Sequence, residues 1–258
     1  MIASFRSEWL RLRRRPAVWI ISALLVVILL TFTYALVWIV FTYPPKGLTV
    51  SGTTPAELKR ILYPAGWLNT VLGDTTGLGG AIALILGVLA AGSEYTWGTV
   101  KTMVTQGPGR LRVLAGKAAA LELLLALLAL AMLAAGAAAS AVLVSVDGKD
   151  SAWPSIGLVA GALASAWLIL TMYAGLGFAL AILLRQPALA LGIGLVYTLV
   201  VEGLALSLLR AADVFKPIIA ALPGPNSGGL IAAFPSQAPA TAMPLMGPGQ
   251  AAVVLIAY

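Results

Sequence analysis

A run of 27 residues without a charge, 17–43, is the strongest constraint on the fold of this chain. A helix rises about 1.5 Å per residue and the hydrocarbon core of a bilayer is about 30 Å thick, so such a run can cross a membrane. The composition agrees, because 60% of the residues are hydrophobic and only 10% are charged, against about 25% charged residues in soluble domains. We therefore expect an all-α integral membrane protein with a single membrane domain over residues 1–258.

Further apolar segments predict four more membrane helices, at 69–91, 118–144, 156–184 and 188–209. The last apolar stretch, 250–258, would rise only about 15 Å as a helix and cannot cross a bilayer. We interpret it as the beginning of a sixth membrane helix that is cut short in this sequence. The alternative is a five-span protein with a hydrophobic tail.

The sequence contains neither histidine nor cysteine. Their absence excludes thiolate and imidazole nucleophiles, histidine bases, haem ligation, and zinc sites built from cysteine and histidine. No convincing Ser/Lys pair or pair of carboxylates replaces them. We therefore expect a protein that is not itself an enzyme and that binds no metal or cofactor of its own.

The basic residues indicate the orientation of the chain. The formal charge is +7, and five of the sixteen basic residues fall in positions 1–15, beside the first apolar run. Ten Lys and Arg residues lie in segments on the N-terminal side of the predicted spans and six lie on the opposite side. Because positive loops tend to stay in the cytoplasm, this bias predicts a multi-pass protein of the plasma (inner) membrane with a cytoplasmic N-terminus, and it does not suggest nucleic-acid binding.

Residues 1–15 have the pattern of a helix lying in the membrane interface. One helical stripe consists of Ile2, Phe5, Trp9 and Leu12. The charged residues spread around the remainder are Arg6, Glu8, Arg11, Arg14 and Arg15. We expect Pro16 to stand near the start of the first span, where its missing N–H is tolerated. The predicted anchor consists of Trp9, Arg11, Arg13, Arg14 and Arg15; a positive-inside anchor without an amphipathic role is the alternative.

The pattern of residues 93–110, between the second and third predicted spans, predicts a short amphipathic helix. Thr99 can cap it, and the Gly-Pro-Gly sequence at 107–109 must end it. Between these signals an apolar face forms at i, i+3 and i+4, from Val100, Met103 and Val104. A short exposed helix with such a face normally binds a partner. The alternative is an interfacial turn that rests on lipid.

Residues 210–248 contain seven of the fifteen prolines, interrupted by apolar pieces at 217–222 and 229–234. This mixture suits short re-entrant helices that dip into the outer leaflet. A disordered proline-rich linker is the alternative, although such linkers lack this many apolar residues.

Three acidic residues lie in or near the predicted spans, where a charge costs about 2.5 kcal/mol or more. These candidate translocation-path residues are Asp74, Glu122 and Glu202. We expect Asp74 to lie at the water boundary and Glu122 to form a structural pair with Lys117.

Glu202 is the most unusual of the three because it lies well inside the fifth predicted span. It could line a translocation cavity and attract a cationic or amphipathic substrate. As a structural group it could instead be protonated, or bond to Tyr197, Thr198 or a neighbouring helix. In the fourth span, Gly157 and Gly161 form a Gly-x-x-x-Gly motif, and further glycines are scattered through the spans, namely Gly77, Gly79, Gly80, Gly175, Gly177, Gly192 and Gly194. We interpret these glycines as packing within the chain, with dimerisation as the alternative.

Several of these motifs together resemble the ABC-2 type permeases of ATP-binding cassette transporters. The resemblance rests on the basic segment at 8–15, on Gly92-Ser-Glu-Tyr-x-x-Gly-Thr99 after the second span, and on Gly107-Pro-x-Arg110 with Gly116-Lys117 before the third. It implies six membrane helices, a second permease copy or homologous permease, and two cytoplasmic ABC ATPase subunits that bind ATP and Mg. The curtailed sixth helix departs from this pattern.

The resemblance also implies that the segment after the second span is a coupling helix, roughly 95–106, that docks into the ATPase. The implied docking residues are Glu94, Tyr95, Gly98, Thr99, Val100, Lys101, Met103 and Val104. Glu94 could orient this segment by pairing with Lys101 or Arg110.

The sequence has no Gly-x-x-x-x-Gly-Lys-Ser/Thr motif, hence no phosphate-binding loop for ATP. We expect a permease subunit that exports a hydrophobic or amphipathic substrate, such as a drug, an antimicrobial peptide or a lipid, powered by a separate ATPase. The main alternative is a proton-coupled secondary transporter that uses Glu202 and Asp74. A membrane enzyme and a non-transporting assembly subunit are less favoured.

Overall fold

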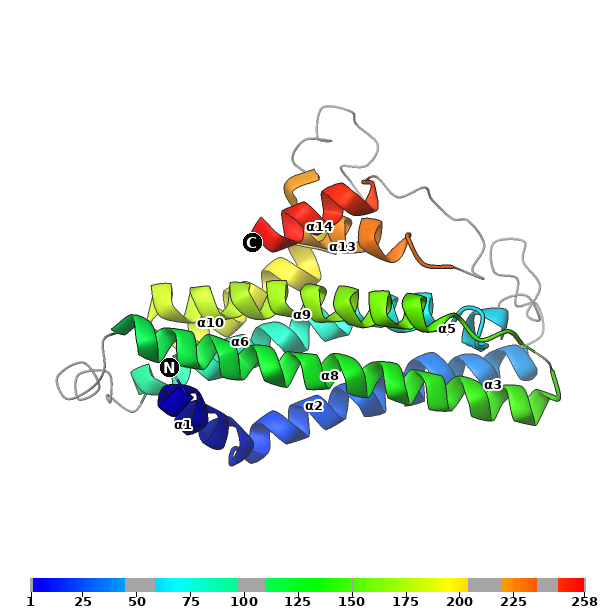
Figure 1. The fold of residues 1–258 in the computed structure, drawn as a ribbon, viewed down its shortest axis with the longest axis horizontal. Helices are drawn as coiled ribbons and strands as arrows, with labels where there is room; N and C mark the ends of the chain where they lie inside the picture. Colours follow the sequence, from blue (N-terminus) through cyan, green and yellow to red (C-terminus); the bar gives the residue numbers. More distant parts are fainter. Residues whose placement is uncertain are drawn as a thin grey trace.

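The computed structural model describes residues 2–44, 59–96, 110–149, 151–203, 220–235 and 246–257, and every regular element among them is a helix (Figure 1). Four helices are long and apolar enough to cross a membrane: Pro16–Thr42, Trp67–Gly92, Arg112–Asp147 and Ile156–Leu184. The predicted all-α membrane fold and the positions of the first four spans are confirmed. The fifth and sixth expected spans correspond to shorter apolar helices, Pro187–Val201 and Pro248–Ala257.

The N-terminal part of the chain forms a short helix, a turn and the first span. In chain order its elements are α1 (Ile2–Arg13), α2 (Pro16–Ile28), the π-helical η1 (Leu29–Leu36) and α3 (Val37–Thr42). Pro16 is the first residue of α2, as predicted, and its fixed φ suits a helix start. Because Arg15 is extended (φ −89°, ψ 110°), the chain turns sharply between α1 and the span.

The second span is built from three consecutive helical segments and the third and fourth from one helix each. The short 3-10 helix η2 (Arg60–Leu62) precedes the second span. The elements of these three spans are α5 (Trp67–Asp74), η3 (Thr75–Gly79), α6 (Gly80–Thr96), α8 (Arg110–Asp147) and α9 (Ile156–Leu184). The fifth begins with α10 (Pro187–Val196) and η4 (Tyr197–Val201), and the later helices are α13 (Pro223–Ile231) and α14 (Pro248–Ala257).

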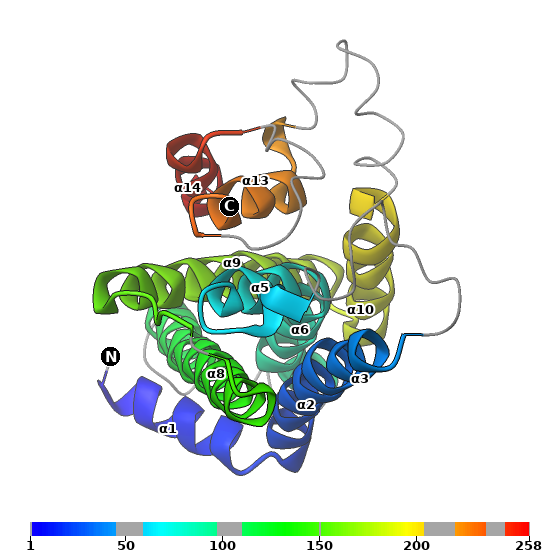
Figure 2. The ribbon, with the colours of Figure 1, turned by 90° about the vertical axis from the view of Figure 1, so that its right-hand side faces the viewer.

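The second span is the centre of the bundle. Of its most apolar stretch 72% is buried, against only 17% for the first span. Viewed along the bundle, α5 and α6 lie among α2, α8, α9 and α10 (Figure 2). The first span therefore exposes most of its apolar surface to lipid or to another chain.

The closest helix packing joins α6 to α9 through glycines. A Cβ atom on Gly87 would collide with the carbonyl of Ala174, and one on Gly177 would collide with the carbonyl of Leu84. The predicted packing of the Gly-x-x-x-Gly motif within the chain is confirmed for Gly161, where a Cβ atom would lie 3.6 Å from the ring of Phe234. It is wrong for Gly157, where a Cβ atom would meet only the side chain of Ser155, the residue before α9, among the described residues. The Gly-x-x-x-Gly motif is common in apolar helices, and here the glycines that allow close approach lie on two different helices.

The described part of segment 210–248 contains α13, which packs against α14 on the outer side of α9 (Figures 1 and 2). A helix in this segment agrees with the prediction of short helices; its re-entrant position in the membrane stays a prediction. The remaining residues, 210–219 and 236–245, lie outside the described part of the chain.

Candidate functional site

Helix α1 lies across one end of the bundle and packs against α8. Leu12 is buried, and Phe5 and Trp9 are partly buried against the core. The polar side of the helix exposes Arg6, Arg13 and Arg14. The predicted amphipathic helix therefore exists, with its apolar side resting on protein, and its role as a membrane anchor stays a prediction.

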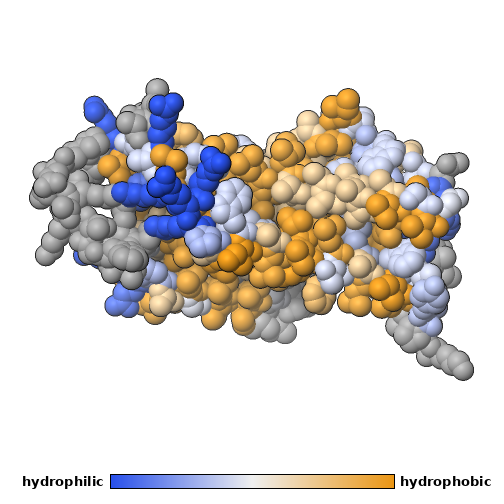
Figure 3. Space-filling model, turned by 90° about the horizontal axis from the view of Figure 1, so that it is seen from below, coloured by the Kyte–Doolittle hydropathy of each residue, from blue (hydrophilic) through white to orange (hydrophobic). Residues whose placement is uncertain are grey.

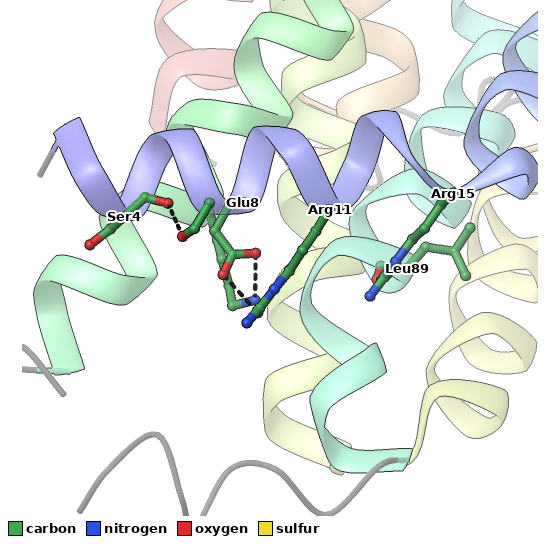
Figure 4. A network of polar contacts seen from close by, with 7 residues as sticks. Ser4, Glu8, Arg11, Arg15 and Leu89 are labelled. Atoms are coloured by element: carbon green, nitrogen blue, oxygen red, sulfur yellow. Dashed lines mark hydrogen bonds and ion pairs between the residues drawn. The ribbon is translucent and has the colours of Figure 1, made fainter. Parts of the chain in front are cut away.

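Glu8 is buried where α1 meets α8, although its position in the sequence suggested a solvated face. Its Oε2 accepts a hydrogen bond from Nζ of Lys117 at 3.1 Å, and its Oε1 accepts one from Nη1 of Arg11 at 3.1 Å (Figure 4). The side chains of Glu8 and Lys117 are only 8% and 6% exposed. Because removal of either partner would leave a buried charge without its counter-ion, this pair fixes α1 on α8.

The predicted pair between Glu122 and Lys117 is wrong. Glu122 accepts a hydrogen bond from Oγ1 of Thr171 in α9 at 2.7 Å, whereas Lys117 pairs with Glu8. Five positions on a helix correspond to a rotation of about 140°, so the two side chains face different neighbours. Glu122 therefore links the third and fourth spans.

Arg15 connects the turn after α1 to the second span. Its Nη1 donates a hydrogen bond to the carbonyl oxygen of Leu89 in α6 at 3.1 Å. In the same turn, Nε1 of Trp19 donates to the carbonyl oxygen of Arg13 at 2.8 Å. The N-terminal segment is thus attached both to α8 and to α6, the helices that flank residues 97–109.

Most of the predicted docking residues lie outside the described residues, namely Gly98, Thr99, Val100, Lys101, Met103 and Val104. Glu94 and Tyr95 lie in the last turn of α6, which ends at Thr96. Helix α8 begins at Arg110, near the same end of the bundle as α1 (Figure 1). The docking role of this segment stays a prediction.

Glu202 is bonded to the helix next to it and to α13. Its Oε2 accepts a hydrogen bond from the hydroxyl of Tyr173 in α9 at 2.7 Å, and the backbone N–H of Gly224 also bonds to its carboxyl group. Glu202 is 4% exposed, and its Oε1 has no partner among the described residues. An acidic side chain at a helix N-terminus satisfies free N–H groups there, so this geometry suits a structural cap for α13.

Asp74 lies at the end of α5, and its predicted position at the water boundary stays a prediction. It lies against the first span beside the hydroxyl of Thr33, and its Oδ2 is shielded and has no hydrogen-bond partner among the described residues. The aspartate is half-buried because the second span is enclosed by other helices.

Two of the three intramembrane acids adjoin π-helical segments. Asp74 directly precedes η3, and Glu202 directly follows η4. Short π-helical stretches occur frequently at functional sites, because the extra residue per turn disrupts the regular bonding of the helix. The second and fifth spans are therefore irregular at their acidic residues.

Sequence reasoning missed a polar cluster at the other end of α8. Nζ of Lys59 lies 2.9 Å from the carboxylate of Asp147, which also accepts hydrogen bonds from Tyr63 at 2.7 Å and from Trp38 at 3.3 Å. Nζ of Lys59 also lies 5.0 Å from the centre of the Trp38 ring. Burial and the bond to Asp147 raise the pKa of Tyr63 to about 12. The cluster joins the ends of the first three spans.

A weak sequence signal for this cluster existed. Asp147 is an isolated acid directly after a long apolar run, and Lys59 and Tyr63 are four positions apart, the spacing of one helical face. Nothing in the sequence showed that these groups meet.

A comparison with known protein families gives a match that extends over most of the chain. Residues 4–201 match the family model described as "ABC-2 family transporter protein". The match begins at residue 4, within α1, and covers the four long helices and the fifth span to the end of η4. No curated protein and no solved structure matches the chain.

Proposed function

The chain belongs to the ABC-2 family of transporter proteins, and from this membership we propose that it is the permease subunit of an ABC exporter powered by a separate ATPase. As a multi-pass membrane protein without a phosphate-binding loop in its sequence, it requires another chain to hydrolyse ATP. ATP and Mg would bind to cytoplasmic ATPase subunits. In this proposal the chain lies in the plasma (inner) membrane with its N-terminus in the cytoplasm.

The observation that supports this proposal best is the attachment of α1 to both helices that flank residues 97–109. Glu8 bonds to Lys117 of α8, and Arg15 bonds to Leu89 of α6. A partner bound to the 93–110 segment would therefore displace α1, α6 and α8 together. Packed elements of this kind can transmit a rigid-body movement between two arrangements.

The proposed cycle begins when ATP binding draws the two ATPase subunits together. The movement passes through the docking segment to the central second span and opens a path for alternating access or lateral extrusion. Hydrolysis then resets the transporter.

The substrate class follows from the apolar interior. The buried residues of the described helices are mostly Leu and Ala, with few charges. Such a path favours a hydrophobic or amphipathic substrate, and a drug, an antimicrobial peptide or a lipid would fit. The acidic groups that such a path could include are Asp74, Glu122 and Glu202. Of these, Glu202 is hydrogen-bonded to two other elements, α9 and α13.

We further propose that two permeases assemble, either two copies or two homologues. The first span supports this, since only 17% of its most apolar stretch is buried within one chain. Lipid covers whatever part of this surface the second permease leaves open.

Proton-coupled transport has less support. Asp74 lies beside Thr33 of the first span, whereas Glu202 is bonded to Tyr173 and Gly224. Among the described residues no chain of hydrogen bonds joins the two acids, as a proton relay would require.

Co-purification with the cognate ATPase tests the proposal. The variant Val100→Asp with Met103→Asp places two charges on the predicted apolar face, and we expect it to lose ATPase binding and the stimulation of ATP turnover. A matched control is Thr102→Asp with Thr105→Asp, which adds the same charge on the opposite side of the predicted helix. Normal assembly and turnover with the first variant would show that the docking assignment is wrong.

A further inference from the structure

A small crevice opens beside α1, where this helix meets α6 and α8. It is lined by Glu8, Arg11, Leu12, Arg15, Ala90 and Lys117. The enclosed volume is about 10 Å³, close to the space of one water molecule, and the crevice is partly open to the outside. It can therefore admit one atom of a larger ligand whose remainder stays outside.

The charge presented by this crevice is positive. The carboxylate of Glu8 is the only negative group among the described lining residues, and both of its oxygens accept hydrogen bonds, one from Lys117 and the other from Arg11. The described partner of Arg15 is a neutral carbonyl oxygen, that of Leu89. A guanidinium has five N–H donors and suits oxyanions with two oxygens in its plane, so Arg15 retains donors for an anion.

In a bilayer crossed by the first span, Arg15 would lie near the lipid phosphates. It directly precedes Pro16, the first residue of the first span, and phosphates lie just outside the hydrocarbon that this span crosses. Apolar side chains cover the middle of the molecule and hydrophilic ones gather at the end where α1 lies (Figure 3). Arg6, Arg13 and Arg14 are exposed on the same helix and would attract an anionic membrane surface in general.

We propose that this crevice binds the phosphate of an anionic lipid headgroup, with the Arg15 guanidinium as its principal ligand and one phosphoryl oxygen inside the crevice. A free phosphate ion offers the same chemistry. The lipid is favoured because the crevice encloses room for one atom only, and the headgroup can remain at the membrane surface. The proposal depends on the membrane location of the chain and not on the ATPase partner, so the two can fail separately.

The test uses the full chain, purified in a neutral detergent and titrated with phosphatidylglycerol, phosphatidylcholine or inorganic phosphate. Two measurements are made: the thermal denaturation midpoint, and the number of phosphatidylglycerol molecules retained in native mass spectrometry. The variant is Arg15→Gln. Its matched controls are Arg13→Gln and Arg14→Gln, which remove the same charge from exposed neighbouring positions.

We expect phosphatidylglycerol to raise the midpoint of the wild type and of both controls, and Arg15→Gln to need about tenfold more lipid for the same effect. Mass spectrometry should show one fewer tightly retained lipid in this variant. If Arg15→Gln does not fold, Arg15→Lys keeps the charge but loses the planar donors, and weaker retention than in the controls supports the site.

Equal weakening in Arg13→Gln and Arg15→Gln would overturn the proposal in favour of diffuse attraction. Unchanged binding in Arg15→Gln would also overturn it. If phosphatidylcholine raised the midpoint as much as phosphatidylglycerol does, the site would not require a lipid with a net negative charge. If inorganic phosphate did so, the site would bind a free ion and not a lipid. Each result contradicts the proposal.

Discussion

Nζ of Lys117 lies 3.1 Å from Oε2 of Glu8, a residue 109 positions earlier, and both side chains are almost completely buried. This ion pair makes the N-terminal helix part of the bundle. Together with the bond from Arg15 to Leu89, it attaches the N-terminal segment to both helices that lead to the proposed docking segment.

Loss of this ion pair is expected to destabilise the protein strongly. Lys117→Met leaves the buried carboxylate of Glu8 without its shielded counter-ion, so the free energy of unfolding should fall by about 3 kcal/mol or more. Thermal denaturation of the purified protein measures this change. Arg112→Met, an exposed position on the same helix, is the control, and an equal small effect of both variants would contradict the structure. The double variant with Glu8→Gln should recover part of the loss.

The contact between α6 and α9 gives a second prediction. Gly87→Ala and Gly177→Ala each place a methyl group against a backbone carbonyl of the facing helix, and each should lower stability by about 1–3 kcal/mol. Gly175→Ala is the matched control on α9, because a methyl group there meets nothing within 4 Å. Since alanine favours a helix over glycine, the control should be neutral or slightly stabilising. Similar melting of Gly175→Ala and Gly177→Ala would argue against this packing.

Features that depend on local periodicity could be predicted from the sequence. Contacts between residues far apart in the chain could not. The first four spans, the start of the first span at Pro16 and the amphipathic character of α1 follow from apolar runs and helical spacing. Burial of Glu8 could not be predicted, because it depends on Lys117 across 109 positions. A packing role for Gly177 was predicted from its small size, but its partner on another helix, the carbonyl of Leu84, could not be. Gly87, which faces the carbonyl of Ala174, was not singled out.

The cluster at the far end of α8 gives a prediction on pH dependence. The pKa of Tyr63 is raised to about 12, above the value of about 10 for an unfolded chain, so folding favours the protonated phenol. This contribution to stability is fully present below pH 10 and is lost as the pH rises towards 12. Thermal denaturation across this range should therefore show a steeper decline for the wild type than for Tyr63→Phe.

Asp147→Asn provides the control for that prediction. Burial is the largest cause of the raised pKa, so Tyr63 in this variant should titrate below the wild-type value and still above about 10. The difference in phenolate absorbance between each protein and its Tyr63→Phe counterpart isolates this tyrosine. A wild-type Tyr63 that titrates near pH 10 would contradict the structure.

The role of Glu202 can be decided by comparing its partners. If its carboxylate caps α13, then Glu202→Gln, Tyr173→Phe and Gly224→Ala should each lower the thermal midpoint, because all three disturb the same group of hydrogen bonds between Glu202, Tyr173 and Gly224. The added Cβ atom on Gly224 would lie 2.7 Å from Oε2 of Glu202. Losses of about 1–3 kcal/mol are expected, and pairs of these variants should lose less than the sum of the single effects. Gly228→Ala, in the same helix but with open space around it, is the control and should leave the midpoint unchanged or slightly raised. Additive losses would contradict a shared hydrogen-bonded unit. A Glu202→Gln protein of wild-type stability that no longer supports export would assign Glu202 to the translocation path instead of the cap.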